Sequence, residues 1–256
     1  MKWCAFLFAA AAILTSSSCG RGSSTGFTQT GGSSKWTWMS GADAANQSGV
    51  YGTQGIAASG NAPGSREQSI SWIDSSGNLW LFGGDGYDSE GTNGFLNDLW
   101  KYDSGTAGSV PSDLGQWTWV DGSDIANQSG IYGTQGVASS SNVPGARNSE
   151  VRWLDSSGNL WLFGGGGYDT NGTLGPLNDL WEYSSGQWTW VSGSSSPDQS
   201  GTYGTLGTPG SGTVPGARQY SVDWVDSSGN FWIFSGYGFD STGILGRLND
   251  LWRYEP

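Results

Sequence analysis

Asp74-Ser-Ser-Gly-Asn-Leu-Trp-Leu-Phe-Gly-Gly84 is the stretch that decides the fold of this chain, because it occurs three times. Residues 155–165 repeat it without change, and residues 226–236 repeat it with three substitutions. In each copy, Asp-Ser-Ser-Gly-Asn is typical of a tight turn, in which Gly77 offers a positive φ. The apolar residues that follow are typical of a strand, which Gly-Gly is expected to end. The sequence therefore predicts one small structural unit that is built three times.

Three further motifs recur around this stretch and set the limits of the repeat. They are Trp-Thr-Trp at 36–38, 117–119 and 188–190, Pro-Gly-x-Arg at 63–66, 144–147 and 215–218, and Leu-Asn-Asp-Leu-Trp at 96–100, 177–181 and 248–252. The first two copies are 81 residues apart, and the next two are 71 apart, because a Gly-, Ser- and Pro-rich segment lies between Tyr102 and Trp117. The repeat units are therefore about 36–116, 117–187 and 188–256.

Each unit is predicted to supply four strands, because apolar and polar residues alternate between turn residues. In the first copy these strands are Arg66–Ile73, Leu79–Phe82, Asn97–Tyr102 and Trp117–Val120. The same strands recur in the other copies, except that the last copy lacks a fourth strand of its own. Trp36–Met39 has the sequence of a fourth strand, with no first three strands before it. No segment shows a capped helical period, so the predicted class is all-β.

The combination of these motifs resembles the Kelch repeat, each copy of which forms one four-stranded blade of a β-propeller. The resemblance rests on Arg before the first strand, Gly-Gly after the second, Asn-Asp-Leu-Trp-x-Tyr in the third and Trp-x-Trp in the fourth, and it covers residues 36–254. It extends to the central domain of galactose oxidase and implies a β-propeller with three Kelch-like blades encoded in this chain. The repeat is longer than the roughly 50 residues of Kelch, and Ser235 replaces one Gly.

Three blades are fewer than the roughly 4–8 of a typical propeller. One interpretation is that Trp36–Met39 serves as the outer strand of the last blade, as in propellers whose two termini share a blade. The other is that the chain is a fragment of a larger repeat array. We also expect a homo-oligomer, for example two copies that complete a six-bladed ring, because an open set of blades exposes its edges.

Net charge and the absence of histidine exclude several classes of function. The chain has 10 Lys and Arg against 22 Asp and Glu, a formal net charge of −12 and no His. Nucleic-acid binding needs a basic patch, and an anionic membrane surface would repel this chain. Without His there is no Ser-His-Asp triad and no His-ligated metal, so the copper radical chemistry of galactose-oxidase-like enzymes is rejected. We expect no metal, no cofactor and no catalysis.

Residues 1–18 are predicted to be an export signal, in which Lys2 precedes an apolar run too short to span a bilayer. Cys19 follows four small residues, which resembles the lipidation site of bacterial lipoproteins, although Ser16 stands where that family usually has Leu. Residues 19–35 are a Gly- and Ser-rich tether. We expect an exported protein, held at the cell envelope or outer membrane only through a lipid on Cys19. Simple secretion to the extracellular space and an uncleaved anchor are the alternatives.

The first candidate ligand site lies where the long connections between strands gather. In an antiparallel four-strand order, Gly122–Gly145 and Gly164–Pro176 lie on one face, and binding usually occurs on loops that a rigid scaffold displays. Aromatic rings beside carboxylates suit sugar recognition, although they also suit packing and capping of their own loop. The candidates on this face are Tyr87, Tyr168, Tyr237, Asp88, Asp169 and Asp240.

Arg66, Arg147 and Arg218 are the second group of candidates, since each begins the innermost strand of its predicted blade. The Kelch resemblance places them near the mouth of a central channel, where a ring of arginines would bind carboxylates bidentately. The alternative is that each arginine bonds to loop carbonyls or to the Asp of a neighbouring blade. Other polar residues of these strands that could line the channel are Glu67, Gln68, Glu150, Arg152, Tyr220 and Asp223.

These observations favour a non-catalytic binding module for glycans or partner proteins at the cell surface. The alternatives are a metal-independent enzyme, in which the arginines and Glu150 imitate the Kelch-like sialic acid mutarotases, and a structural part of a larger array. The 16 tryptophans are expected to pack between blades rather than to stack on sugars, because they occupy fixed positions in the strands.

Overall fold

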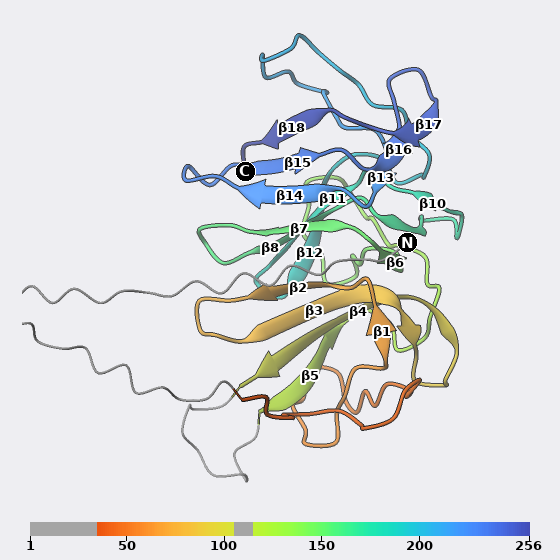
Figure 1. The fold of residues 1–256 in the computed structure, drawn as a ribbon, viewed down its shortest axis with the longest axis vertical. Coiled ribbons are helices and arrows are strands. Elements are labelled where there is room, and N and C mark those ends of the chain that lie inside the picture. The colour runs from red at the N-terminus through yellow and green to blue at the C-terminus, as the bar shows by residue number, and fades with distance from the viewer. Residues whose placement is uncertain (1–34, 105–114) are drawn as a thin grey trace, which may run out of the picture. The chain divides into compact units, whose positions relative to one another are not determined.

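A computed structural model of the chain describes residues 35–104 and 115–256 (Figure 1). Within these ranges the regular secondary structure consists of β-strands without helices, which confirms the predicted all-β class for the described residues. None of the described segments is thus a helix long and apolar enough to cross a membrane. The predicted export signal, Cys19 and the tether up to residue 34 lie outside the described residues.

The strands form three groups that follow the sequence repeat, and we call them the first, second and third modules (Figure 1). The first module consists of β1 (Arg66–Glu67), β2 (Ile70–Ile73), β3 (Leu79–Tyr87), β4 (Asn93–Asp103) and β5 (Gln116–Asp121). The second consists of β6 (Arg147–Asn148), β7 (Val151–Leu154), β8 (Leu160–Phe163), β9 (Gly166–Tyr168), β10 (Leu174–Pro176), β11 (Leu180–Ser184) and β12 (Gln187–Ser192). The third consists of β13 (Arg218–Gln219), β14 (Val222–Val225), β15 (Phe231–Phe234), β16 (Tyr237–Phe239), β17 (Leu245–Arg247) and β18 (Leu251–Tyr254).

The main sheet of each module is antiparallel, and its strands follow chain order. The order is β2-β3-β4-β5 in the first module and β7-β8-β11-β12 in the second. Within the described residues, the third module has the order β14-β15-β18. The predicted succession of four strands is therefore confirmed for the first two modules.

The first strand of the repeat is broken in two, although the sequence predicted a continuous strand over Arg66–Ile73. Gln68 has a φ of 55° and separates β1 from β2. On the partner strand, Gly83 and Gly84 have φ values of 64° and 99°, and the pairing register shifts beside them. In the first module Gly-Gly therefore kinks the strand instead of ending it, so that β3 continues to Tyr87 and pairs with β1. In the second and third modules β8 and β15 end at Phe163 and Phe234, directly before this motif, as the sequence predicted.

The predicted loop over Gly164–Pro176 is a short hairpin. In the second module β9 pairs with β10 and β6, and in the third β16 pairs with β17 and β13. A turn closes each hairpin. In the second module, for example, the N–H of Asp169 donates to the carbonyl of Thr173 at 3.0 Å. The N–H of Gly130 in the long connection donates to the carbonyl of Asp169 at 3.1 Å. This contact confirms that the two long segments share a face.

Residues 55–61 of the long connection run along the outer edge of the first module. The N–H of Gly55 donates to the carbonyl of Trp119 on β5, and Nδ2 of Asn61 donates to that of Trp117. Because an exposed strand edge invites pairing with other chains, this segment protects β5. The second module repeats the arrangement along β12.

The prediction of a strand at Trp36–Met39 is wrong. These residues have no regular secondary structure, and the side chains of Trp36 and Trp38 are exposed. The same Trp-Thr-Trp sequence forms a strand in β5 and β12, where it pairs with β4 and β11. Among the described residues, no strand pairs with Trp36–Met39 in this way. The motif thus becomes a strand only beside a neighbouring strand.

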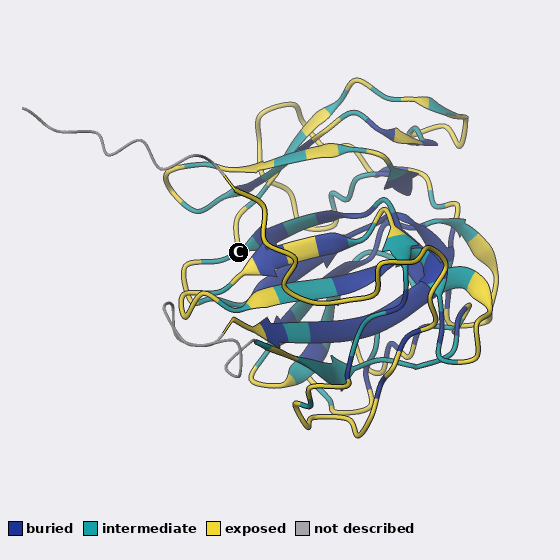
Figure 2. Ribbon diagram, turned by 60° about the horizontal axis from the view of Figure 1, so that its bottom comes forward, coloured by how far each residue is buried: buried dark blue, intermediate teal, exposed yellow. Residues whose placement is uncertain are grey.

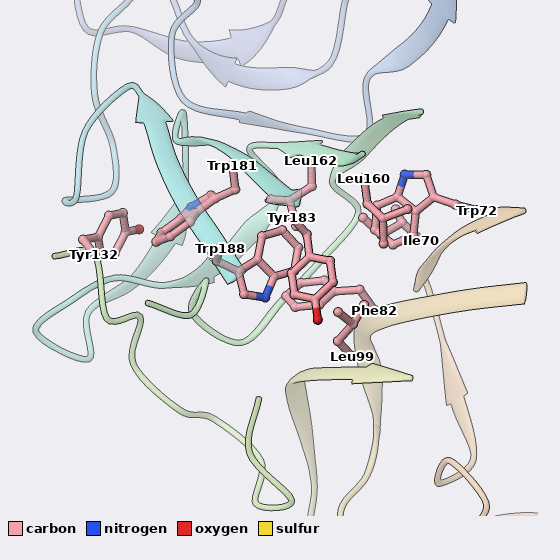
Figure 3. Close-up of a cluster of buried hydrophobic side chains, with 10 residues drawn as sticks. All are labelled: Ile70, Trp72, Phe82, Leu99, Tyr132, Leu160, Leu162, Trp181, Tyr183 and Trp188. Atoms are coloured by element: carbon pink, nitrogen blue, oxygen red, sulfur yellow. The ribbon is translucent and has the colours of Figure 1, made fainter. Parts of the chain in front are cut away.

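Neighbouring modules pack against each other through two apolar clusters. The cluster in Figure 3 joins the first module to the second and contains Ile70, Trp72, Phe82, Leu99, Tyr132, Leu160, Leu162, Trp181, Tyr183 and Trp188. The other joins the second module to the third and contains Val151, Trp153, Trp161, Phe163, Leu180, Phe231 and Ile233. The expectation that tryptophans pack between the repeated sheets is confirmed for the buried tryptophans of these clusters.

Candidate functional site

The structure places the predicted arginine ligands inside the modules instead of around an opening. Arg147 is fully buried, and its guanidinium forms a bidentate ion pair with Asp179, in which both N–O distances are 2.7 Å. Its Nε and Nη1 also donate to the carbonyls of Gly145 and Gly164, both at 3.0 Å. Little of this guanidinium remains for a ligand.

The aspartate of each pair also accepts hydrogen bonds from a tyrosine hydroxyl and an indole. In the second module, Tyr132 donates to Asp179 at 2.6 Å and Trp181 donates at 2.7 Å. The same four-residue cluster is found in the other two modules: Arg66, Asp98, Tyr51 and Trp100 in the first, and Arg218, Asp250, Tyr203 and Trp252 in the third.

Burial and ion pairing keep the charges of these clusters fixed. Burial, strengthened by the charge of Asp179, raises the pKa of Tyr132 well above its usual value, so its hydroxyl remains a donor. Burial opposes ionisation of Asp250, but hydrogen bonds from Arg218 and its neighbours outweigh it and lower the pKa of this carboxyl to about 2.

This placement contradicts the predicted ring of ligand-binding arginines at Arg66, Arg147 and Arg218. It is close to the alternative in which each arginine bonds to loop carbonyls and an aspartate, except that the aspartate belongs to the same module. A guanidinium needs compensation for its charge when it is buried, and the aspartate of the Leu-Asn-Asp-Leu-Trp motif supplies it.

The aspartates of the hairpin face cap their own turns. Oδ1 of Asp88 accepts from the N–H groups of two turn residues at 2.9 and 2.8 Å, and Oδ2 accepts from that of Ala126 at 3.0 Å. Burial acts to raise the pKa of Asp88, but these bonds outweigh it and lower the pKa. Asp169 and Asp240 cap their turns in the same way. The carboxylates of the predicted sugar site thus serve their own hairpins.

The structure does not bring the three predicted tyrosine ligands together. Tyr87 and Tyr168 are half-buried, and the ring of Tyr168 meets Phe95 edge to face at 6.3 Å between centroids. Tyr237 is 40% exposed, but it occupies the repeat position of Asp85 rather than that of the other two tyrosines. The hairpin face therefore presents separate rings.

The strands β2, β7 and β14 follow one another in the structure (Figure 1). The residues of these three strands line a groove. Its volume is about 340 Å³, and it lies at the strand ends that lead to the Asp-Ser-Ser-Gly-Asn turns, away from the hairpins. Its walls are formed by Ser71, Trp72, Ile73, Arg152, Trp153, Leu154, Asp223 and Val225. Of these, the sequence singled out Arg152 and Asp223 as channel-lining candidates and missed the rest.

Ser71, Arg152 and Asp223 occupy the same repeat position and give the groove its polar side chains. Nη1 of Arg152 lies 3.9 Å from Oδ2 of Asp223, and these side chains are 41% and 26% exposed. Nε of Arg152 donates to the carbonyl of Ser71. Burial raises the pKa of Asp223, while the charge of Arg152 opposes that change. The residues on either side of this position are apolar in every unit. The polar side chain in the groove therefore differs between the three units, while its apolar neighbours do not.

Glu150 is a buried acid whose carboxyl oxygens have no hydrogen-bond partner in another residue. The other units have Ser69 and Ser221 at this position, and their hydroxyls donate to main-chain carbonyls. Burial raises the pKa of Glu150 to about 8, although the charge of Arg147 works against it. The side chain therefore holds its proton at neutral pH.

No protein-family model matches the chain, and no curated protein matches its sequence. Two similar solved structures are that of YjhT, with a TM-score of 0.41, and that of a fungal alcohol oxidase of the AA5 family in complex with copper, with a TM-score of 0.40. Both are 15% identical to this chain over 75% of its length. The chain spans 52% of the first and 32% of the second. Similarity at this level establishes neither a family nor an activity.

Replacing Asp179 by Asn is expected to lower the free energy of unfolding by about 3–5 kcal/mol, because the buried charge of Arg147 loses its partner. Asp250→Asn is the matched change in the third module. There the aspartate side chain is 15% exposed, against 0% for Asp179, so its charge is already partly solvated and the loss should be smaller, although Arg218 itself is 1% exposed. Urea unfolding measures both values. Equal losses in the two variants would contradict the role given to burial.

Glu150→Gln is expected to stabilise the protein at alkaline pH. The pKa of Glu150 is raised from 4.5 to about 8 in the folded chain, so the folded state binds a proton that the unfolded state has lost. Stability therefore falls as the pH rises between these values, by about 1.4 kcal/mol for each unit that separates the two pKa values. Unfolding should show a variant that is more stable than the wild type near pH 8.5 and similar to it near pH 4. Parallel pH profiles would refute this.

Proposed function

We propose that this chain is an exported, Kelch-like β-propeller module that binds a glycan or a partner protein at the cell surface without catalysis. We assign the binding to the groove between β2, β7 and β14. The observation that carries the proposal is the repeat position of Ser71, Arg152 and Asp223, which changes in every unit while its apolar neighbours persist. Binding sites are commonly built from side chains that a rigid scaffold positions, while the scaffold itself stays constant.

The chemistry of the groove favours a sugar among these ligands. A guanidinium and a carboxylate 3.9 Å apart present donors and an acceptor side by side, which suits neighbouring hydroxyl groups. Ile73 and Val225, which are 63% and 47% exposed, offer apolar surface to the C–H groups of a ring. Both charged side chains are partly exposed, so a ligand in the groove can reach them.

The burial of Arg66, Arg147 and Arg218 supports binding over the alternative of a metal-independent sugar-processing enzyme. Such an enzyme would need these guanidiniums at its substrate, whereas each is held in an ion pair with an aspartate. Glu150 keeps its proton but is 7% exposed, which leaves it poorly placed to meet a sugar.

A glycan array with the full chain identifies the ligand, and titration calorimetry then tests the groove. Arg152→Ala is expected to weaken binding at least tenfold, because charge-assisted hydrogen bonds from the guanidinium are lost. Arg247→Ala changes an exposed arginine on the hairpin strand β17 and should leave the affinity unchanged. If only the Arg247 variant loses binding, the hairpin face is the site. If no glycan binds, a protein partner or the structural interpretation replaces the sugar.

Export and a lipid on Cys19 form the second part of the proposal, supported by the apolar run and small residues that precede this cysteine. In bacteria fed a radioactive fatty acid, the wild-type chain and Cys4→Ser are expected to carry label, while Cys19→Ser is not. Cys4 is a suitable control because it is the other cysteine of the chain. Label that persists in Cys19→Ser would contradict a lipid at this residue.

A further inference from the structure

The third module has an apolar face whose counterparts in the other modules are buried. We call it the open face; it consists of Val222, Trp224, Trp232, Phe234 and Leu251. Four of these side chains are between 38% and 57% exposed, whereas the equivalent residues of the second module are at most 5% exposed. Figure 2 shows the contrast, with dark blue in the strands of the first two modules and mostly teal and yellow in the third.

In the first and second modules, the face equivalent to the open face is covered by the next module in sequence, which inserts one side chain into it. At the second module this residue is Phe231, whose ring stacks on Trp153 at 5.0 Å and meets Trp161 edge to face at 5.4 Å. At the first module it is Leu160, which is 2% exposed in the cluster of Figure 3. On the open face the corresponding space is a hollow of about 480 Å³ between Trp224, Trp232, Phe234 and Leu251, with Val225 and Asp226 at its side.

Leu79 is the first module's copy of this inserting residue. It is 40% exposed, whereas its equivalents Leu160 and Phe231 are 2% and 1% exposed. Ile73, which pairs with Leu79 across β2 and β3 and so lies on the same side of the sheet, is 63% exposed. The first module therefore presents the inserting residue, and the third module presents the hollow.

A main-chain hydrogen bond also repeats at each junction, from an N–H of one module to a carbonyl of the module before it. The N–H of Ser149 donates to the carbonyl of Gln68 at 3.2 Å, and the N–H of Tyr220 donates to the carbonyl of Ser149 at 3.1 Å. All three residues occupy one repeat position and have a positive φ. Each junction between modules thus repeats one main-chain bond as well as one inserted side chain, so the junction is a defined, reusable interface.

We propose that the open face of one copy of this chain docks on the first module of a second copy, with Leu79 in the hollow. Two copies joined in this way at both ends form a closed pair of six modules. The occupant follows from continuity: the two junctions inside the chain already join these same surfaces, so the chain itself carries the complementary partner. Interfaces of this head-to-tail kind close into rings when the rotation permits, and six lies within the roughly 4–8 blades of propellers.

Sedimentation velocity of the full chain tests the proposal, with twice the chain mass as the expected result. Trp224→Glu removes the hollow and Leu79→Glu removes the inserting residue, and each variant alone is expected to sediment as a monomer. Leu206→Glu changes a side chain of the long connection that is 101% exposed and lies outside the open face, and it should leave the dimer intact. A wild-type monomer, or an open series of larger assemblies, overturns the proposal.

Mixing the two monomeric variants separates this contact from a symmetric one. The Trp224→Glu copy keeps Leu79, and the Leu79→Glu copy keeps the hollow, so one intact junction should restore a dimer. If two open faces met each other instead, Leu79→Glu alone would remain a dimer and the proposal would fail. Near-ultraviolet circular dichroism confirms that the variants keep the fold, and Leu251→Glu replaces Trp224→Glu if that variant does not.

Discussion

A buried arginine–aspartate pair holds each module together, and the other segments are arranged around it. In the second module Arg147 begins the first strand, Asp179 precedes the third, and Tyr132 comes from the long connection, so one cluster fastens three distant segments. This arrangement requires glycine at position 145, because a Cβ there would lie 1.8 Å from the carbonyl oxygen of Tyr168. Since a buried charge without a partner is strongly destabilising, the segments have one arrangement that satisfies it. This is the physical reason why Pro-Gly-x-Arg and Leu-Asn-Asp-Leu-Trp repeat together.

Those parts of the fold that depend on neighbours in the chain could be predicted. The Asp-Ser-Ser-Gly-Asn turn is such a part: Oδ1 of Asp74 accepts from the N–H groups of Ser76 and Asn78, and Gly77 has the expected positive φ. The break at Gln68 could not be predicted, because it arises from pairing with a kinked strand farther along the chain. The strand expected at Trp36–Met39 could not be judged from the sequence either, because the same motif forms a strand only where a neighbouring strand pairs with it.

The candidate site was less predictable than the fold, because a side chain's partner is a tertiary property. A periodic arginine has the same sequence pattern whether it faces a channel or an aspartate of its own module. The sequence does place an aspartate 32 residues after each arginine in all three units, but this constant separation follows from the repeat and does not by itself show that the two side chains meet. The groove depends even more on packing: Arg152 and Asp223 lie 71 residues apart, and only the junction of β7 with β14 makes them neighbours.

The groove and the proposed junction share β2 and β14, so the two proposals together predict that ligand binding and self-association are linked. Inside the chain, each junction sets two first strands side by side, and the groove follows this series from Ser71 through Arg152 to Asp223. A second copy that docks on the open face sets its own β2 beside β14, which extends the series past Asp223. A ligand that spanned this extension would contact both copies and stabilise the pair, and the pair would in turn strengthen ligand binding, because coupling between two binding equilibria is reciprocal. The junction would thus define the ligand site as well as the number of copies.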